Sequence, residues 1–128
     1  MRDLHAIGSV TIADGAAVSG AIAIPAGYAV VAIAVPDSWT ASMDMGFQVN
    51  TTGSTYVDVF SGVGTTVARA RLTGIKTDGA NFVIVPQAVL NFIPLGCNIK
   101  LTSINAADNT DGNQTGAISP TVWVARAE

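Results

Sequence analysis

The stretch from Tyr28 to Phe60 constrains the fold most, because it reads as three short strands in succession. These strands are expected at Tyr28–Val35, Met45–Asn50 and Tyr56–Phe60. Each run is rich in β-branched or aromatic residues and is bounded by Pro, Asp, Ser or Gly, which is typical of strands rather than helices. The connection Thr51–Thr55 contains a glycine and has the length of a hairpin loop. This part of the chain therefore predicts an all-β module and shows no reaction centre.

The remaining sequence repeats this strand-and-turn pattern. Further strands are expected at His5–Ile12, Val18–Ile24, Thr66–Leu72, Phe82–Val85, Ile99–Ile104 and Thr121–Ala127, with Met1–Leu4 as an arm or as the lead into the first strand. In the last strand, Val122 and Val124 are expected on one face and Trp123 on the other. Val89–Ile93 fits either a short strand or one helical turn.

The number and spacing of these strands predict the architecture. About eight or nine strands, with turn signals roughly every 8–12 residues, are typical of a sandwich or barrel. No stretch sustains a helical period and no internal repeat occurs. The strand count, together with the absence of a Cys…Trp…Cys frame, favours a jelly-roll-like β-sandwich over an immunoglobulin-like one. We expect one domain over residues 1–128.

The composition predicts that part of the surface is covered by other protein. Hydrophobic residues make up 49% of the chain and charged residues only 12%, with a mean hydropathy of +0.46. The charged fraction is about half of that in ordinary soluble domains. A small monomer needs charged surface to stay dissolved, so this chain is expected to assemble with copies of itself or with a partner. A surface covered by Thr, Ser, Asn and Gly is the alternative.

The distribution of charge argues against two classes of partner. The net charge is −3, and the six cations lie scattered at Arg2, Arg69, Arg71, Lys76, Lys100 and Arg126. Nucleic-acid binding requires a concentrated positive footprint, so it is not expected. Gly15–Pro36 is uncharged and long enough for a membrane span. Pro25–Gly27 interrupts this stretch, however, so two core strands joined by a turn explain it better. No signal-peptide pattern is visible at the N-terminus.

Residue types that perform acid–base or nucleophilic chemistry are scarce. His5 and Cys97 are the only histidine and cysteine, and no G-x-S-x-G elbow occurs. His5 is interpreted as a surface or strand residue, and Cys97 as a small buried one. Asp37, Asp44 and Asp58 could serve glycoside hydrolysis. Asp37 and Asp44 stand in turn-like settings, however, and Asp58 is interpreted as a solvent-side or interface residue. The chain is therefore not expected to be an enzyme.

One loop has the composition of a calcium site. Placing Gly112 of Asp108–Asn113 at the glycine of the EF-hand pattern puts Ala107 at position one and Ile118 at position twelve, so both anchoring carboxylates are missing. A looser calcium site built from the oxygens of this loop stays open. The pair of glycines in Gly62–Gly64 lacks the third glycine of a phosphate-binding motif. No cofactor is expected.

Three aromatic residues offer a further interpretation. Trp39, Trp123 and Tyr56 could stack on sugars as in carbohydrate-binding modules. The two tryptophans lie in or beside strands and are more simply core or interface residues.

The order of segments resembles a family of small virion proteins encoded in the structural-gene clusters of tailed bacteriophages. The similar passages are Gly20–Gly27, Ala32–Pro36, Trp39–Ala41, Gly46–Asn50, Thr52–Val59 and Ile99–Ser103. One departure is Met43–Gly46, an altered version of the connection before Phe47. The matched residues are core and turn positions, so no functional residue is carried over.

The resemblance implies a structural function rather than a catalytic one. Such proteins are similar to β-sandwich capsid decoration (cement) proteins, which sit on the outer surface of the head lattice, often as trimers, and reinforce it. We therefore expect a virion protein, made in the cytoplasm of a host bacterium, whose partner is the major capsid protein and which forms a homo-oligomer, with a trimer favoured. The alternatives are a tail, baseplate or fibre accessory domain that contacts the host surface, and a carbohydrate-binding module.

Overall fold

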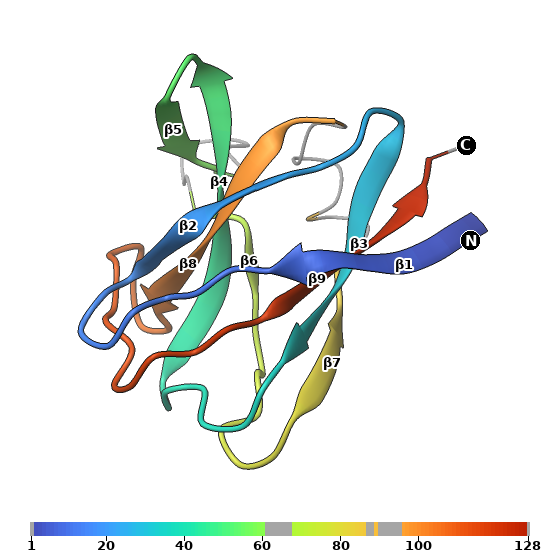
Figure 1. Ribbon diagram of the computed structural model, residues 1–128. Helices are drawn as coiled ribbons and strands as arrows, with labels where there is room; N and C mark the ends of the chain where they lie inside the picture. The colour runs from blue at the N-terminus through green and yellow to red at the C-terminus, as the bar shows by residue number, and fades with distance from the viewer. Residues whose placement is uncertain (1, 61–67, 87–88, 90–95, 128) are drawn as a thin grey trace.

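The fold is a sandwich of two antiparallel β-sheets, seen in a computed structural model that describes residues 2–60, 68–86, 89 and 96–127. The strands are β1 (Arg2–Ser9), β2 (Val18–Ala23), β3 (Tyr28–Val35), β4 (Met43–Thr52), β5 (Thr55–Asp58), β6 (Arg71–Leu72), β7 (Asn81–Ile84), β8 (Asn98–Asn105) and β9 (Thr121–Arg126). One sheet has the order β1-β9-β3-β7. The other has the order β2-β8-β4-β5, with β6 paired to β4 (Figure 1). The predicted all-β sandwich is confirmed.

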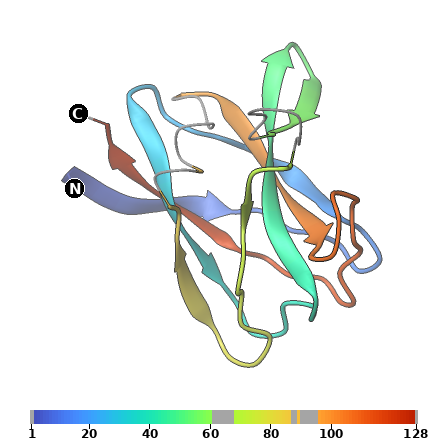
Figure 2. The same ribbon diagram turned by 180° about the vertical axis from the view of Figure 1, so that it is seen from behind.

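The pairing of the strands is that of a jelly roll. Leaving out the short β6, the strands pair as nested partners, β1 with β9, β2 with β8, β3 with β7 and β4 with β5. The chain thus behaves as one long hairpin that turns at the β4–β5 connection and is rolled up into two sheets. Because β1 pairs with β9, the two ends of the chain lie side by side (Figure 2).

The first strand is shifted from its expected position. β1 covers Arg2–Ser9 rather than His5–Ile12, because its pairing with β9 runs from Arg2↔Arg126 to Ser9↔Thr121. Beyond Ser9 the chain turns inward toward the core. Ile12 then forms an isolated bridge with Ile118 and is fully buried, so it is paired but lies outside the strand.

The β4–β5 hairpin is tighter than the sequence indicated. β4 extends to Thr52 and pairs there with Thr55, so the connection is Gly53–Ser54 rather than Thr51–Thr55. Gly53 has a φ of 53°, a left-handed conformation that glycine adopts at little cost and that two-residue hairpin turns require.

Two other expected segments are observed only in part. The strand expected at Thr66–Leu72 is reduced to β6 and an isolated bridge between Arg69 and Phe60, and its first two residues lie outside the described part of the chain. Of Val89–Ile93, only the buried Val89 lies within the described residues.

The main cluster of buried side chains lies between the two sheets and is apolar. Its most enclosed members include Val30, Ile33, Val35, Met45, Phe47, Ile99, Leu101, Val122 and Val124. A register shift between Val30 and Ala32 inserts one extra residue into β3, which lets Val30 and Ile33 both face inward. Each such side chain stabilises the fold by roughly 1.5–3 kcal/mol relative to an exposed one.

The uncharged stretch Gly15–Pro36 forms β2 and β3, which belong to different sheets. Its break at Pro25–Gly27 carries the chain from one sheet to the other, with Gly27 at a φ of 80°. Among residues 2–60, 68–86, 89 and 96–127, no helix is long and apolar enough to cross a membrane.

Candidate interaction surface

The outward side of the four-stranded sheet carries a continuous set of apolar side chains. Val122 and Val124 enter the core and Trp123 points the other way, as predicted. The register aligns Trp123 with Ala6 on one side and Ala32 on the other, while Ala32 and Ala34 align with Ile84 and Phe82. Leu4 shares the face of Ala6 by strand alternation. We call this set the apolar face: Leu4, Ala6, Ala32, Ala34, Phe82, Ile84 and Trp123.

Two aromatic rings meet over the central strand of this face. Phe82 on β7 and Trp123 on β9 lie with their ring centroids 5.5 Å apart and their planes at 80°. Their strands flank β3, so the two backbones are about 10 Å apart. The rings can lean across this gap because β3 presents only the methyl groups of Ala32 and Ala34 between them. Ala32 is consequently 1% exposed although it points away from the core.

Three large side chains of the apolar face remain open to solvent. Ile84 is 64% exposed, Leu4 49% and Phe82 48%. The four strands together present a face on the order of 400 Å², estimated from strand spacing and rise. Within this face, the exposed parts of Leu4, Phe82 and Ile84 form a patch of apolar surface of the kind that often marks an interaction site. The apolar face is therefore the candidate functional site.

The ion pair nearest the apolar face lies at one end of the sheet. Arg126 and Asp3 form this exposed pair, with 2.9 Å between Nη2 and Oδ2, and strand alternation places Arg126 on the side of Val122 and Val124 rather than of Trp123. The carboxylate of Asp3 raises the pKa of the Arg126 guanidinium. Between this end and the β3–β4 turn, the outward positions of β9, β3 and β7 carry no ionisable side chain. A partner seated on the face would have no charge to neutralise.

The histidine and the cysteine lie in different parts of the fold. His5 is on the exposed β1, where its ring packs edge to face against Tyr28 with centroids 5.5 Å apart. Cys97 precedes β8 in the other sheet and is half-buried, and burial raises the pKa of its thiol. These two residues do not form a nucleophile pair.

The three candidate aspartates each support the structure locally. Asp37 accepts a hydrogen bond from the backbone of Gly79 at 2.7 Å, as expected of a turn residue. Asp44 is not in a turn: it lies within β4, is 8% exposed, and pairs with Arg71. Asp58 lies on β5 with its side chain 32% exposed, and its carboxylate accepts hydrogen bonds from Gln48 and Arg69.

The three candidate sugar-stacking residues do not come together. Trp39 is 1% exposed, and its indole N–H donates to the carbonyl of Met43 at 2.8 Å, so it is a core residue. Trp123 lies on the apolar face. Tyr56 is on β5 of the other sheet, with the ammonium group of Lys100 4.4 Å from its ring centroid.

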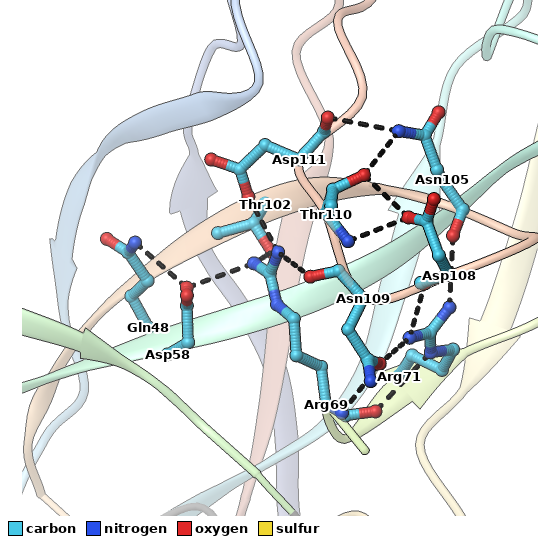
Figure 3. Close-up of polar contacts among 10 residues, drawn as sticks. All are labelled: Gln48, Asp58, Arg69, Arg71, Thr102, Asn105, Asp108, Asn109, Thr110 and Asp111. Carbon is cyan, nitrogen blue, oxygen red and sulfur yellow. Dashed lines mark hydrogen bonds and ion pairs between the residues drawn. The ribbon is translucent and has the colours of Figure 1, made fainter. Parts of the chain in front are cut away.

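Sequence reasoning missed a second feature, in which arginine side chains hold the β8–β9 loop (Figure 3). Arg69 is 4% exposed and donates to Asp58 on β5 at 2.9 Å, to Thr102 on β8 at 3.2 Å, and to Asp111 of the loop at 2.6 Å. The backbone carbonyl of Asn109 accepts a further bond from Arg69 at 3.3 Å. We call Arg69 and the residues that it contacts (Asp58, Thr102, Asn109 and Asp111) the arginine clamp.

Arg71 extends the clamp along the same loop. Its guanidinium donates to the carbonyls of Asn105 and Asp108 at 3.2 and 3.0 Å, and to Oδ1 of Asn109 at 2.6 Å. The carboxylate of Asp44 forms an ion pair with Arg71, with 3.3 Å between Oδ2 and Nη1. Two guanidinium groups thus bind the oxygen atoms that made this loop resemble a calcium site. The alternation Arg69-x-Arg71, close in sequence to Asp58, is the only sequence signal of this arrangement.

Hydrogen bonds within the loop also stabilise the negative charge of Asp108. Asp108 accepts hydrogen bonds from the hydroxyl and the backbone amide of Thr110, which lower the pKa of its carboxyl group. Within the described part of the chain, no group of three or more His, Cys, Asp or Glu residues could hold a metal ion. The glycines of Gly62–Gly64 lie outside the described residues.

Comparison with protein-family models, with curated proteins and with solved structures finds no match to this chain. A functional assignment therefore depends on the jelly-roll fold, the apolar face and the sequence resemblance.

Proposed function

We propose that this protein is a virion structural protein, a decoration protein that binds the outer surface of a phage head. Its partner is the major capsid protein of the assembled lattice, and its docking surface is the apolar face. The observation that carries the proposal is the exposure of Leu4, Phe82 and Ile84 on one uncharged sheet face. The resemblance of the sequence to small phage virion proteins supplies the particular partner.

The chemistry of the apolar face defines what it can bind. A flat, uncharged sheet surface fits a partner surface that is itself apolar, since a charged partner would lose hydration without gaining an ion pair. Covering the three exposed side chains removes roughly 300 Å² of apolar surface from water, worth about 7 kcal/mol. Association costs roughly 4–15 kcal/mol in lost freedom, so one contact alone is weak.

A weak contact suits a lattice that repeats the same site many times. A protein that binds only the assembled lattice stabilises it by RT ln(1 + [L]/Kd) at each site. Homo-oligomers strengthen the binding further, because linked copies dock together. The trimer implied by the resemblance stays a prediction, and the molar mass of the purified protein in solution tests it.

The placement of the basic residues supports a protein partner over a nucleic acid. Of the six cations in the sequence, Arg69 and Arg71 are engaged in the arginine clamp, and Arg126 is paired with Asp3. The remaining cations are too few to build the positive footprint that phosphate binding needs.

The experiment mixes purified protein with undecorated heads and measures co-sedimentation and the heat resistance of the heads. Ile84→Lys places a charge in the apolar face, and Val57→Lys is the matched control on β5 of the other sheet, where Val57 is 42% exposed. We expect the wild type and the control to bind and Ile84→Lys to bind at least tenfold more weakly, because a lysine leaves its charge unpaired in the contact. Absence of wild-type binding, or equal binding by both variants, contradicts the proposal.

A carbohydrate-binding module is the second candidate, favoured by the paired rings of Phe82 and Trp123 on an accessible surface. It predicts saturable glycan binding that Trp123→Ala abolishes while head binding is absent. A tail or baseplate accessory uses the same face, and immunogold labelling on tails instead of heads identifies it.

A further inference from the structure

Arg69 occupies a position that a metal ion takes in many oxygen-rich loops. Its side chain is 3% exposed and reaches oxygen atoms from three separate elements. Nη2 donates to the carboxylate of Asp58 on β5 and the hydroxyl of Thr102 on β8. Nη1 donates to the carboxylate of Asp111 and the carbonyl of Asn109 in the loop. Four oxygen atoms thus converge on one buried cation (Figure 3).

The arrangement fits a guanidinium better than a spherical ion. Each terminal nitrogen serves two of the four oxygens, at 2.6–3.3 Å, which are hydrogen-bond lengths rather than calcium–oxygen lengths of about 2.3–2.6 Å. A guanidinium has a planar fork of donors that can serve two carboxylates from opposite sides. The two carboxylates, Asp58 and Asp111, are 32% and 48% exposed and carry the negative charge of the cage.

The loop depends on this cation because it folds back over the sheet. Asp111 forms an isolated bridge with Ile104, and the backbone of Gly112 donates to the carbonyl of Ser103. The Asn105 side chain donates to Thr110 and to the carbonyl of Asp111, closing the turn. Without a cation between Asp58 and Asp111, these two carboxylates would repel each other across the base of the loop.

We infer that the β8–β9 loop is a cation-binding loop whose resident cation is the Arg69 guanidinium, and that the cage binds a free guanidinium ion when this side chain is shortened. On this inference, the wild-type loop needs no calcium ion, although the sequence Asp108–Asn113 has the composition of a calcium site. The ligand class of the cage is a small planar cation with several N–H donors.

The test is chemical rescue of Arg69→Ala with guanidinium or methylguanidinium chloride at millimolar concentration, far below the denaturing range. The readouts are the melting temperature and the hydrogen exchange of the amides of Asn105, Thr110 and Gly112. We expect Arg69→Ala to melt about 10 °C lower than the wild type, because an ion pair loses its buried partner. Added guanidinium is expected to restore at least half of this loss and to slow exchange in the loop.

Two control variants separate binding in the cage from a general salt effect. Arg69→Met removes the charge but fills the same space, so guanidinium is expected not to rescue it. Arg126→Ala removes an arginine whose ion pair with Asp3 is about half exposed on both sides, and it is expected to change the melting temperature little and to show no rescue. If Arg69→Ala does not fold, Arg69→Lys replaces it, with partial loss of loop protection as the expected result.

The outcomes divide clearly. Rescue of Arg69→Ala by guanidinium, but not by calcium chloride at the same concentration, supports the inference, whereas equal rescue by calcium chloride overturns the assignment of a planar cation. Equal response of Arg69→Ala and Arg69→Met to guanidinium overturns it. A wild type that loses stability in a chelator overturns it as well, because a metal would then be the resident cation.

Discussion

The ring of Phe82 meets the ring of Trp123 edge to face across β3, with 5.5 Å between centroids. The strands that carry these two residues, β7 and β9, are not neighbours in the sheet, because β3 lies between them. The contact exists because β3 alternates large inward residues with outward alanines. The same alanines that make room for the rings keep the outward face flat, so sequence pattern, packing and the shape of the candidate docking surface are linked here.

Enlarging an alanine under the rings should therefore destabilise the fold. Ala32 is 1% exposed, and Ala32→Leu has to push Phe82 and Trp123 apart. We expect a loss of about 1–3 kcal/mol in the free energy of unfolding, the usual cost of overpacking. Ala21→Leu, at an exposed position of β2, is the control and should change stability by less than about 0.5 kcal/mol. Urea denaturation measures both, and equal stabilities would refute the packing account.

Gly46 should not tolerate a side chain. A Cβ atom at this position of β4 would collide with Cδ1 of Ile104 and Oγ1 of Thr102, which cover the outward side of the five-stranded sheet. Gly46→Ala is expected to cost about 1–3 kcal/mol, since both neighbours are buried. Gly20→Ala faces open space and should be neutral or slightly stabilising. Thermal unfolding of the two variants compares them directly.

Asp108 should make the loop sensitive to acid. Thr110 lowers the pKa of this carboxyl through its hydroxyl and its amide, so the folded pKa lies below the unfolded one. The stabilisation is then present at neutral pH and is lost as the pH falls through the folded pKa. Thr110→Val should raise the pKa of Asp108 toward its ordinary value of about 4, as NMR titration of the carboxyl carbon would report. An unchanged pKa in this variant would count against the assigned cause.

Cys97 should react slowly while the protein is folded. Burial raises the pKa of its thiol, so less of the nucleophilic thiolate is present at neutral pH. A group with a raised folded pKa contributes stability below its unfolded pKa and loses it as the pH rises through the folded value. Modification by an aromatic disulfide reagent is expected to be at least tenfold faster in urea than in buffer. Equal rates would show that the thiol is open in the native state.

The fold was predictable from the sequence because local signals agree with the tertiary structure. Strand-forming runs with turn residues between them identified most of the strands, and their number favoured the jelly roll that is observed. The predicted strand boundaries were wrong where pairing with another strand sets the boundary. β1 follows the register of β9, and the hairpin turn shortened to Gly53–Ser54 because glycine allows a left-handed backbone there.

The candidate sites were less predictable because they depend on residues far apart in sequence. The low charge content predicted a covered surface but not which sheet face carries it, since that face combines β1, β3, β7 and β9. The oxygen-rich Asp108–Asn113 loop suggested a cation, and the structure supplies one from Arg69, about 40 residues earlier in the chain. Asp44 was misplaced for the same reason, because its arginine partner is not local.

The most direct test of the proposed function is a cryo-electron microscopy difference map between heads with and without the protein. The account predicts ordered density on the outer lattice into which the jelly roll fits with Phe82, Ile84 and Trp123 against the capsid protein. Density only on the tail, or density on the head with this apolar face turned toward solvent, would contradict it.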